Sequence, residues 1–118
     1  MNINPFLKDE DIDAPVRKLV RALNDIPGVI TFSSCGGHEE PNEIQLPSGQ
    51  YKVNFWLHRN GTGFRALDAI TSALHEFDFD EIQLRAWYNG IKHPDGCVSF
   101  ELYGYGDADE LAEVISAG

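Results

Sequence analysis

Chemically reactive side chains gather in one stretch of this 118-residue chain, Val29 to Pro41, with the sequence VITFSSCGGHEEP. It contains Cys35, one of two cysteines, and His38, one of four histidines. A cysteine and a histidine separated by two residues across a glycine turn have a spacing that zinc sites use. The stretch therefore predicts chemistry based on sulfur and imidazole, either metal binding or nucleophilic catalysis.

Two pairs of side chains are candidate metal ligands. The first is Cys35 with His38, and the second is His93 with Cys97, separated by three residues. Thiolate and imidazole together suit tetrahedral zinc. If the two loops lie at the same end of a sheet, the four side chains can form one site. The alternative is that His93 is a turn residue and Cys97 a buried thiol.

Cys35 is also a candidate nucleophile, with His38 or His58 as its base. Gly36 and Gly37 follow it, and backbone N–H groups in such a turn can bind an anion or an oxyanion. A thiolate forms at neutral pH only beside positive charge or hydrogen-bond donors. The alternative is a cysteine at a strand end that packs beside the loop.

The composition limits the classes of partner and location. The chain carries 19 acidic and 9 basic residues, a formal net charge of −10. Nucleic-acid binding relies on basic side chains, so nonspecific binding to nucleic acids and to anionic membranes is not expected. The chain lacks an apolar run of roughly 20 residues, as a membrane span requires. Its first residues, MNINPFLKDEDID, lack the basic and apolar regions that are expected of a signal peptide. We therefore expect one cytoplasmic domain over residues 1–118, with no disulfide between Cys35 and Cys97.

The spacing of apolar residues predicts helices and strands in the order αββαββα. Apolar residues at helical spacing predict helices after Pro15, from Phe64 to Phe77, and around Leu111. Alternation of apolar and polar residues predicts strands at 29–35, 51–58, 82–87 and 98–103. Residues 36–49 are expected to form a long polar loop. The predicted fold is an α+β two-layer sandwich, in which a four-stranded, mainly antiparallel sheet has its helices on one face.

The same alternation gives the sheet one apolar face and one polar face. We expect a core formed by Val53, Phe55, Leu57, Ile82, Leu84, Val98, Phe100 and Leu102 of the sheet and Val16, Leu19, Val20, Leu67, Ile70 and Leu74 of the helices. In the first strand, the pattern predicts that Ile30 and Phe32 face the core and that Thr31, Ser33 and Cys35 face away from it.

The polar face is expected to stay open and to bind a small molecule or a protein partner. Both tryptophans of the chain are predicted on it, and exposed aromatic patches usually mark contact surfaces. Polar and charged side chains between them would orient the ligand. The candidate binding residues are Ser33, Ser34, Cys35, His38, Trp56, His58, Arg85, Trp87, Glu101 and Tyr103. The alternatives are a homodimer interface and coverage of this face by the N-terminal arm or by the loop at 36–49.

The segment Leu23 to His38, LNDIPGVITFSSCGGH, resembles the start of the wybutosine-synthesis methyltransferase-like family, which acts on transfer RNA. That family has a Ser-Ser-Cys-Ser-Gly-Arg motif at the end of a strand, and the residues that match it are Ser33, Ser34, Cys35 and Gly37. Gly36 replaces the serine, and His38 replaces the arginine. The strand Val53 to His58 also resembles a family segment that ends in Leu-His. The resemblance implies a shared fold and, for the family, binding of S-adenosylmethionine and a modified guanine; we carry over the fold and not the activity.

Three functions are compatible with these features. The leading one is non-enzymatic binding of a small ligand or a protein on the polar face. The second is a methyltransferase-like or thiol-dependent enzyme centred on Ser33, Ser34, Cys35 and His38. The third is a structural zinc module. Zinc and S-adenosylmethionine are the cofactors that these alternatives imply.

Overall fold

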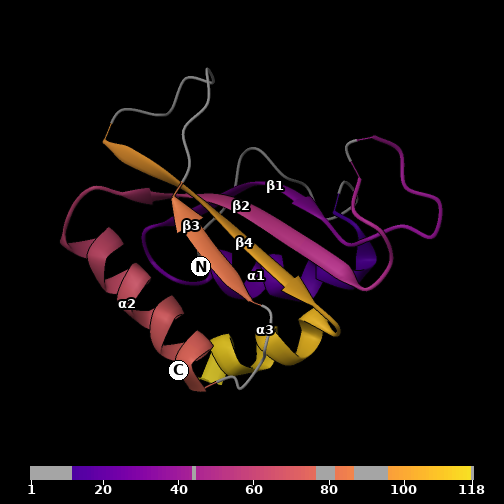
Figure 1. Cartoon of the computed structure of the whole chain (residues 1–118). Coiled ribbons are helices and arrows are strands. Elements are labelled where there is room, and N and C mark those ends of the chain that lie inside the picture. The colour runs from indigo at the N-terminus through magenta and orange to yellow at the C-terminus, as the bar shows by residue number, and fades with distance from the viewer. Residues whose placement is uncertain (1–11, 44, 77–81, 87–95, 118) are drawn as a thin grey trace.

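In a computed structural model, helices pack on one face of a four-stranded antiparallel sheet (Figure 1). The structure describes residues 12–43, 45–76, 82–86 and 96–117. Its elements are the 3-10 helix η2 (Ala14–Val16), α1 (Arg17–Asn24), β1 (Val29–Cys35), β2 (Gln50–His58), α2 (Gly61–Glu76), β3 (Gln83–Ala86), β4 (Cys97–Tyr105) and α3 (Ala108–Ala117). The predicted α+β class and the order αββαββα are confirmed. None of these described helices is long and apolar enough to cross a membrane.

The strand order β1-β2-β4-β3 places the two cysteines at opposite ends of the sheet. Cys35 lies opposite Lys52, near the start of β2, whereas Cys97 lies opposite His58, the last residue of β2. The two positions, Lys52 and His58, are six residue steps apart along an extended strand, which is about 20 Å. We call these regions the Cys35 end and the Cys97 end.

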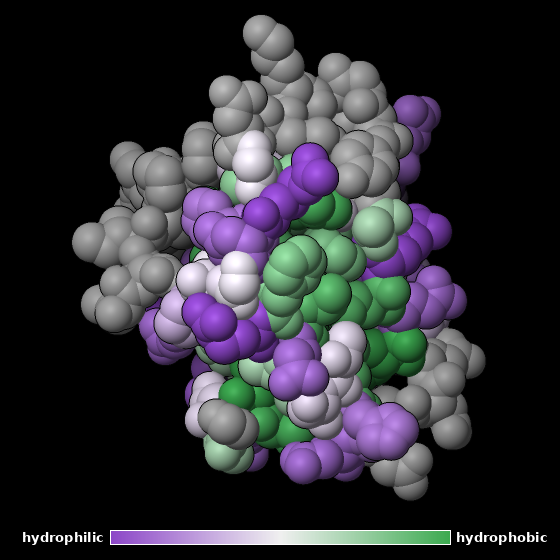
Figure 2. Space-filling view, turned by 90° about the vertical axis from the view of Figure 1, so that its left-hand side faces the viewer, coloured by the Kyte–Doolittle hydropathy of each residue, from purple (hydrophilic) through white to green (hydrophobic). Residues whose placement is uncertain are grey.

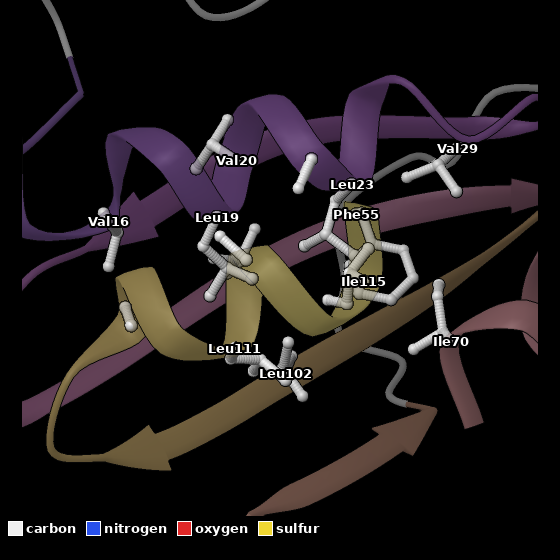
Figure 3. Close-up of a cluster of buried hydrophobic side chains, with 14 of the residues drawn as sticks. Val16, Leu19, Val20, Leu23, Val29, Phe55, Ile70, Leu102, Leu111 and Ile115 are labelled. Atoms are coloured by element: carbon white, nitrogen blue, oxygen red, sulfur yellow. The ribbon is translucent and has the colours of Figure 1, made fainter. Parts of the chain in front are cut away.

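The core lies between the helices and one face of the sheet, which we call the covered face (Figure 3). Val53 and Phe55 of β2 and Leu102 of β4 have no exposed surface, and Leu19 of α1 and Leu111 of α3 pack with them. The predicted core face of these strands is confirmed. The predicted core residues at its margin are only partly buried, and they are Leu67, Leu74, Ile82, Leu84, Val98 and Phe100.

A bulge in β1 changes which side chains face the core. The register shifts between Thr31 and Ser33, so that β1 has one more residue than β2 across this point. Thr31 lies opposite Phe55 on the covered face and is fully buried. Its backbone N–H donates to Asn24 Oδ1 at 3.0 Å, and Asn24 Nδ2 donates to the Thr31 hydroxyl at 2.8 Å. These hydrogen bonds satisfy the polar groups that burial would otherwise leave unpaired.

The opposite face of the sheet, which we call the outer face, receives Ile30 and Phe32. Ile30 lies opposite Trp56, and the Phe32 ring stacks on the Trp56 ring with centroids 4.3 Å apart. The predicted orientations of Ile30, Thr31 and Phe32 are therefore wrong. Because the bulge adds one residue, Ser33 and Cys35 still lie on the outer face, as predicted.

Side-chain caps begin two of the helices. Asn60 Oδ1 accepts the Gly63 N–H at 3.1 Å in α2, and Asp107 Oδ1 accepts the Asp109 N–H at 2.9 Å in α3. Asp13 precedes η2 at the same kind of position, but its carboxylate makes no cap hydrogen bond. The Asp13 side chain is therefore available for contacts elsewhere in the fold.

Candidate functional site

Three side chains from two separate parts of the chain meet at the Cys35 end. They are Asp13, Cys35 and His38, and we call them the Asp13–Cys35–His38 cluster. A carboxylate oxygen, the Cys35 sulfur and a ring nitrogen of His38 all lie within 4.8 Å of one another. His38 Nε2 lies 3.2 Å from Asp13 Oδ2. Among the described residues, no other group of three or more such side chains is close enough to hold a metal ion.

Backbone contacts hold Asp13 against the end of β1. The Gly36 N–H donates a hydrogen bond of 2.9 Å to Asp13 Oδ2. A Cβ atom at Gly36 would lie 2.9 Å from Asp13 Cβ, closer than real Cβ atoms pack, and 3.1 Å from Pro15 Cδ, which is also a tight contact. The absence of a side chain at Gly36 therefore lets the segment before α1 approach the strand and bring its carboxylate to the cluster.

The loop after β1 turns back and covers the cysteine. Gly37 has a φ of +86°, a left-handed conformation that glycine adopts without strain. The His38 N–H donates to Leu46 O at 2.9 Å, and the Leu46 N–H donates to Cys35 Sγ at 3.4 Å. Cys35 is consequently only 6% exposed. The side chains of His38 and Asp13 are 32% and 35% exposed, so the cluster has one buried side and one side open to solvent.

The fold brings Cys35 and His38 together but does not bring Cys97 to them. Cys97 lies at the other end of the sheet, about 20 Å away along the strands. The condition for one site with four ligands, that both loops lie at the same end of the sheet, is therefore not met for Cys35 and Cys97. Cys97 is a buried thiol, as the alternative held, and His93 lies outside the described residues. His58 is also at the Cys97 end, so it is too far from Cys35 to act as its base.

Cys97 has a simpler environment. Its sulfur lies 3.7 Å from His58 Nδ1 on the neighbouring strand. Burial raises the pKa of the Cys97 thiol, because a thiolate is poorly stabilised away from water. Both cysteines are free.

The cluster contains one residue that sequence reasoning missed, Asp13. The sequence around it predicts a helix cap within a run of solvated acidic residues. Its partner Gly36 is 23 residues further along the chain. No local pattern links the two positions, and only the packing of the segment before α1 against β1 brings them together.

The centre of the outer face is not open. Trp56 is 7% exposed, Asn54 is 6% exposed, and Ser99 has no exposed surface. Trp56 does lie on the predicted face, but the prediction that its ring is exposed there is wrong: the residue is buried, and Phe32 stacks against it. Trp87 lies outside the described residues.

Two serines precede Cys35 in the stretch that resembles the methyltransferase-like family. Ser33 lies opposite Asn54 on the outer face, whereas Ser34 lies opposite Val53 on the covered face. The alternation of the strand thus separates them. Of the three consecutive residues from Ser33 to Cys35, the first and the last share a face.

The exposed part of the outer face is near its β3 edge. Arg85 Nη2 donates to Glu101 Oε2 at 3.0 Å, and the guanidinium lies over the Tyr103 ring, 5.2 Å from its centroid. The hydrogen bond to Glu101 raises the pKa of Arg85. A polar cavity of about 200 Å³ lies here, lined by Gln50, Gln83, Arg85, Tyr103, Gly104 and Tyr105. It is smaller than the roughly 300 Å³ at which ligand pockets begin.

Apolar side chains also reach the surface beside α2, on the side of the molecule shown in Figure 2. Phe64 is 69% exposed there, next to a small cavity of about 60 Å³ that Leu67, Val98 and Phe100 help to line. This surface carries no side chain pair suited to catalysis or metal binding among the residues that line it.

Comparison of the chain with protein-family models, curated proteins and solved structures found no match. The resemblance to the wybutosine-synthesis family therefore stays a prediction.

Proposed function

We propose that this chain is a zinc-binding domain, with Asp13, Cys35 and His38 as ligands. The observation that carries the proposal is the mutual approach of their three ligand atoms to within 4.8 Å. The metal would join the segment before α1, the end of β1 and the loop that follows it. Such a link across distant parts of a small domain is how structural zinc contributes to folding.

The distances support a tetrahedral zinc ion. With bonds of roughly 2.0–2.1 Å to nitrogen and oxygen and 2.3 Å to sulfur, neighbouring ligand atoms lie about 3.3–3.6 Å apart. The His38 Nε2 and Asp13 Oδ2 atoms are 3.2 Å apart. Small rotations of the side chains would bring the three atoms around one ion.

Hydrogen bonds around the cluster also support a metal. The Gly36 N–H donates to Asp13 and the Leu46 N–H donates to Cys35. Such contacts hold ligand side chains in place and stabilise their charged forms. A carboxylate and a thiolate would balance the two positive charges of zinc, which makes the burial of Cys35 favourable when the metal is bound.

A thiol-dependent enzyme is the second candidate. It is favoured by the distance of 3.2 Å between His38 and Asp13, because a carboxylate that orients a histidine is typical of a catalytic base. A nucleophile must reach its substrate, however, and Cys35 is 6% exposed under Leu46. Burial suits a metal ligand better, so zinc binding is the preferred function.

Zinc binding by purified protein tests the proposal. The chain is freed of metal with a chelator and dialysed against buffered zinc, and bound zinc is measured by atomic emission. We expect one zinc ion per chain, loss of binding in Cys35→Ser and in His38→Ala, and markedly weaker binding in Asp13→Asn, because a neutral amide replaces a charged ligand. The matched control is Cys97→Ser, which should bind like the unchanged chain.

Two results would contradict the proposal. One is absence of zinc from the unchanged chain at micromolar free zinc. The other is equal binding by Cys35→Ser and Cys97→Ser. Circular dichroism of each variant shows whether it folds. If Cys35→Ser does not fold, Asp13→Asn tests the site instead, because its side chain keeps the size of aspartate.

A further inference from the structure

A cavity of about 420 Å³ lies where the C-terminal ends of α1, α2 and α3 meet. Its lining includes Ala22 of α1, Ala73 of α2 and Ile115 of α3, each in the last turn of its helix. Figure 3 shows α1 and α3 side by side with Leu23 and Ile115 at the same end, and in Figure 1 the ends of α2 and α3 meet beside the letter C. The volume lies within the roughly 300–1,000 Å³ that small-molecule pockets span.

The floor of this cavity is apolar. Ala22, Ala73 and Ile115 are buried, and Ile26 and Val114 are half-buried beside them. An alanine side chain is a single methyl group, so the two alanines leave the space unfilled. A ring or a short alkyl chain in this space would be removed from water, which is favourable.

The rim of the cavity is acidic. Asp25 is the C-cap residue of α1 and Glu76 is the last residue of α2, and both are exposed where they line the cavity. The C-terminal end of a helix carries partial negative charge, so a carboxylate there is unfavourable and a cation is favourable. Neither carboxylate forms an ion pair with another described residue. A bound cation would therefore relieve repulsion at both positions.

The described residues that line the cavity include no cationic side chain. Arg21 and His75 are the basic residues in the last turns of α1 and α2, but neither lines the cavity, and the last turn of α3 has none. The hydroxyls of Ser72 and Ser116, which do line it, can accept hydrogen bonds from N–H groups. The net charge of −10 attracts cations and repels anions at longer range.

We propose that this cavity binds a small organic ammonium ion. The apolar body of the ligand would occupy the space over the floor, and its charged nitrogen would lie at the rim beside Asp25 and Glu76. A metal ion would make no use of the apolar floor, and an anion would meet two carboxylates. The site is independent of the proposed zinc site, because no residue of the Asp13–Cys35–His38 cluster lines the cavity.

Small molecules that share a phenyl ring and differ in charge test the proposal. The full chain, isotope-labelled for NMR, is titrated at pH 7 with phenethylamine, a cation, with phenethyl alcohol, which is neutral, and with hydrocinnamate, an anion. Phenethylamine should shift the amide signals of Ala73, Glu76 and Ile115. It should bind about fivefold more tightly than phenethyl alcohol, because two exposed ion pairs together contribute this much. Hydrocinnamate should bind most weakly.

Variants of exposed residues on α2 test whether the cavity is the site. Glu76→Gln should weaken phenethylamine binding about two- to threefold and leave phenethyl alcohol binding unchanged. Asp68→Asn is the matched control, because it removes a carboxylate from the same helix outside the cavity, and it should bind both molecules like the unchanged chain. Ala69→Leu, which places a larger side chain in the lining, should weaken the binding of both.

Four results would overturn the inference. They are absence of phenethylamine binding at millimolar concentration, equal affinity for phenethylamine and phenethyl alcohol, equal loss in Asp68→Asn and Glu76→Gln, and amide shifts that do not include residues of the cavity. Glu76→Gln should bind zinc like the unchanged chain, so the failure of this site and the failure of the zinc site are distinguishable.

Discussion

Each end of the sheet holds a buried cysteine near a histidine, but the two ends differ in what else reaches the sulfur. At the Cys35 end, Asp13 joins His38, and a backbone N–H donates to the sulfur. At the Cys97 end, the sulfur lies 3.7 Å from His58, and no third such side chain among the described residues completes a metal-binding group. A thiol beside an imidazole therefore becomes a ligand set only where the fold adds further donors.

The two ends also differ in what holds them together. The Cys97 end lies on neighbouring strands, His58 and Cys97 being paired in the sheet, with the buried Trp56 and Ser99 beside them. The Cys35 end joins a strand, a loop and the segment before α1 through polar contacts. We therefore expect the stability of the Cys97 end to depend on apolar packing. The stability of the Cys35 end should depend on zinc.

The largest effect should come from Trp56→Ala near the Cys97 end. Its ring is 7% exposed and stacks on Phe32, so its removal should cost about 3–5 kcal/mol in the free energy of unfolding. Phe64→Ala, at a ring that is 69% exposed, is the control and should cost less than about 0.5 kcal/mol. Urea denaturation measures both. A loss below about 0.5 kcal/mol for Trp56→Ala would mean that packing does not hold this end.

The next effect is the stabilisation of the Cys35 end by zinc. Free zinc at 100 times its Kd should raise the free energy of unfolding by about 2.7 kcal/mol. The gain should persist in Cys97→Ser and vanish in Cys35→Ser. It should also shrink on acidification, because the ligands must be deprotonated to bind the metal. Urea denaturation in buffered zinc at two pH values measures the gain in the free energy of unfolding. An equal gain in Cys97→Ser and Cys35→Ser would contradict the proposal that zinc stabilises only the Cys35 end.

Tyr51, on the covered face at the Cys35 end, should make stability fall at high pH. Burial, together with Asp107 and Glu110, raises its pKa to about 12. Its pKa in the unfolded chain is about 10, so the folded state binds the proton more tightly. The contribution of the protonated Tyr51 hydroxyl to the free energy of unfolding is fully present below pH 10. It is lost as the pH rises through 12. The loss should be about 2 kcal/mol.

Tyr51→Phe should remove most of this alkaline loss. The buried Tyr51 hydroxyl has no hydrogen-bond partner among the described residues, so the variant should cost little at pH 7. Tyr105→Phe is the control, because Tyr105 is 47% exposed, and it should keep the alkaline loss. Denaturation curves between pH 8 and 12 compare the two variants, and an unchanged alkaline loss in Tyr51→Phe would assign it to another group.

The fold was predictable where the pattern of the sequence agrees with the packing. Val53, Phe55 and Leu57 alternate with Lys52, Asn54, Trp56 and His58, and these three apolar residues do face the core. In β1 the pattern and the packing disagree. Thr31 takes the core position because Asn24 satisfies its polar groups, and the bulge then restores the predicted side for Cys35. The alternation of apolar and polar residues along a strand cannot predict the hydrogen bonds between Thr31 and Asn24 of the preceding helix.

The candidate site was predictable only in part for the same kind of reason. Cys35 and His38 are close along the chain, so their spacing identifies them. Asp13 reaches them only through the packing around Gly36. Trp56 is buried and stacks on Phe32, which faces outward because Thr31 faces the core. The position of Asp13 and the burial of Trp56 both depend on contacts between segments that are distant in the chain. A single sequence does not show such contacts.

The smallest effect should be at Cys97 itself. A chain with Cys35→Ser has Cys97 as its only cysteine, so alkylation by iodoacetamide reports on that thiol alone. Because burial raises the pKa of Cys97, its reaction should begin at a higher pH than that of an unfolded cysteine. Zinc should not change its rate, whereas in Cys97→Ser zinc should slow the alkylation of Cys35 at least about tenfold. If zinc protects Cys97 as well, the metal binds there without a third ligand, and the two ends of the sheet do not differ in the way that their side chains indicate.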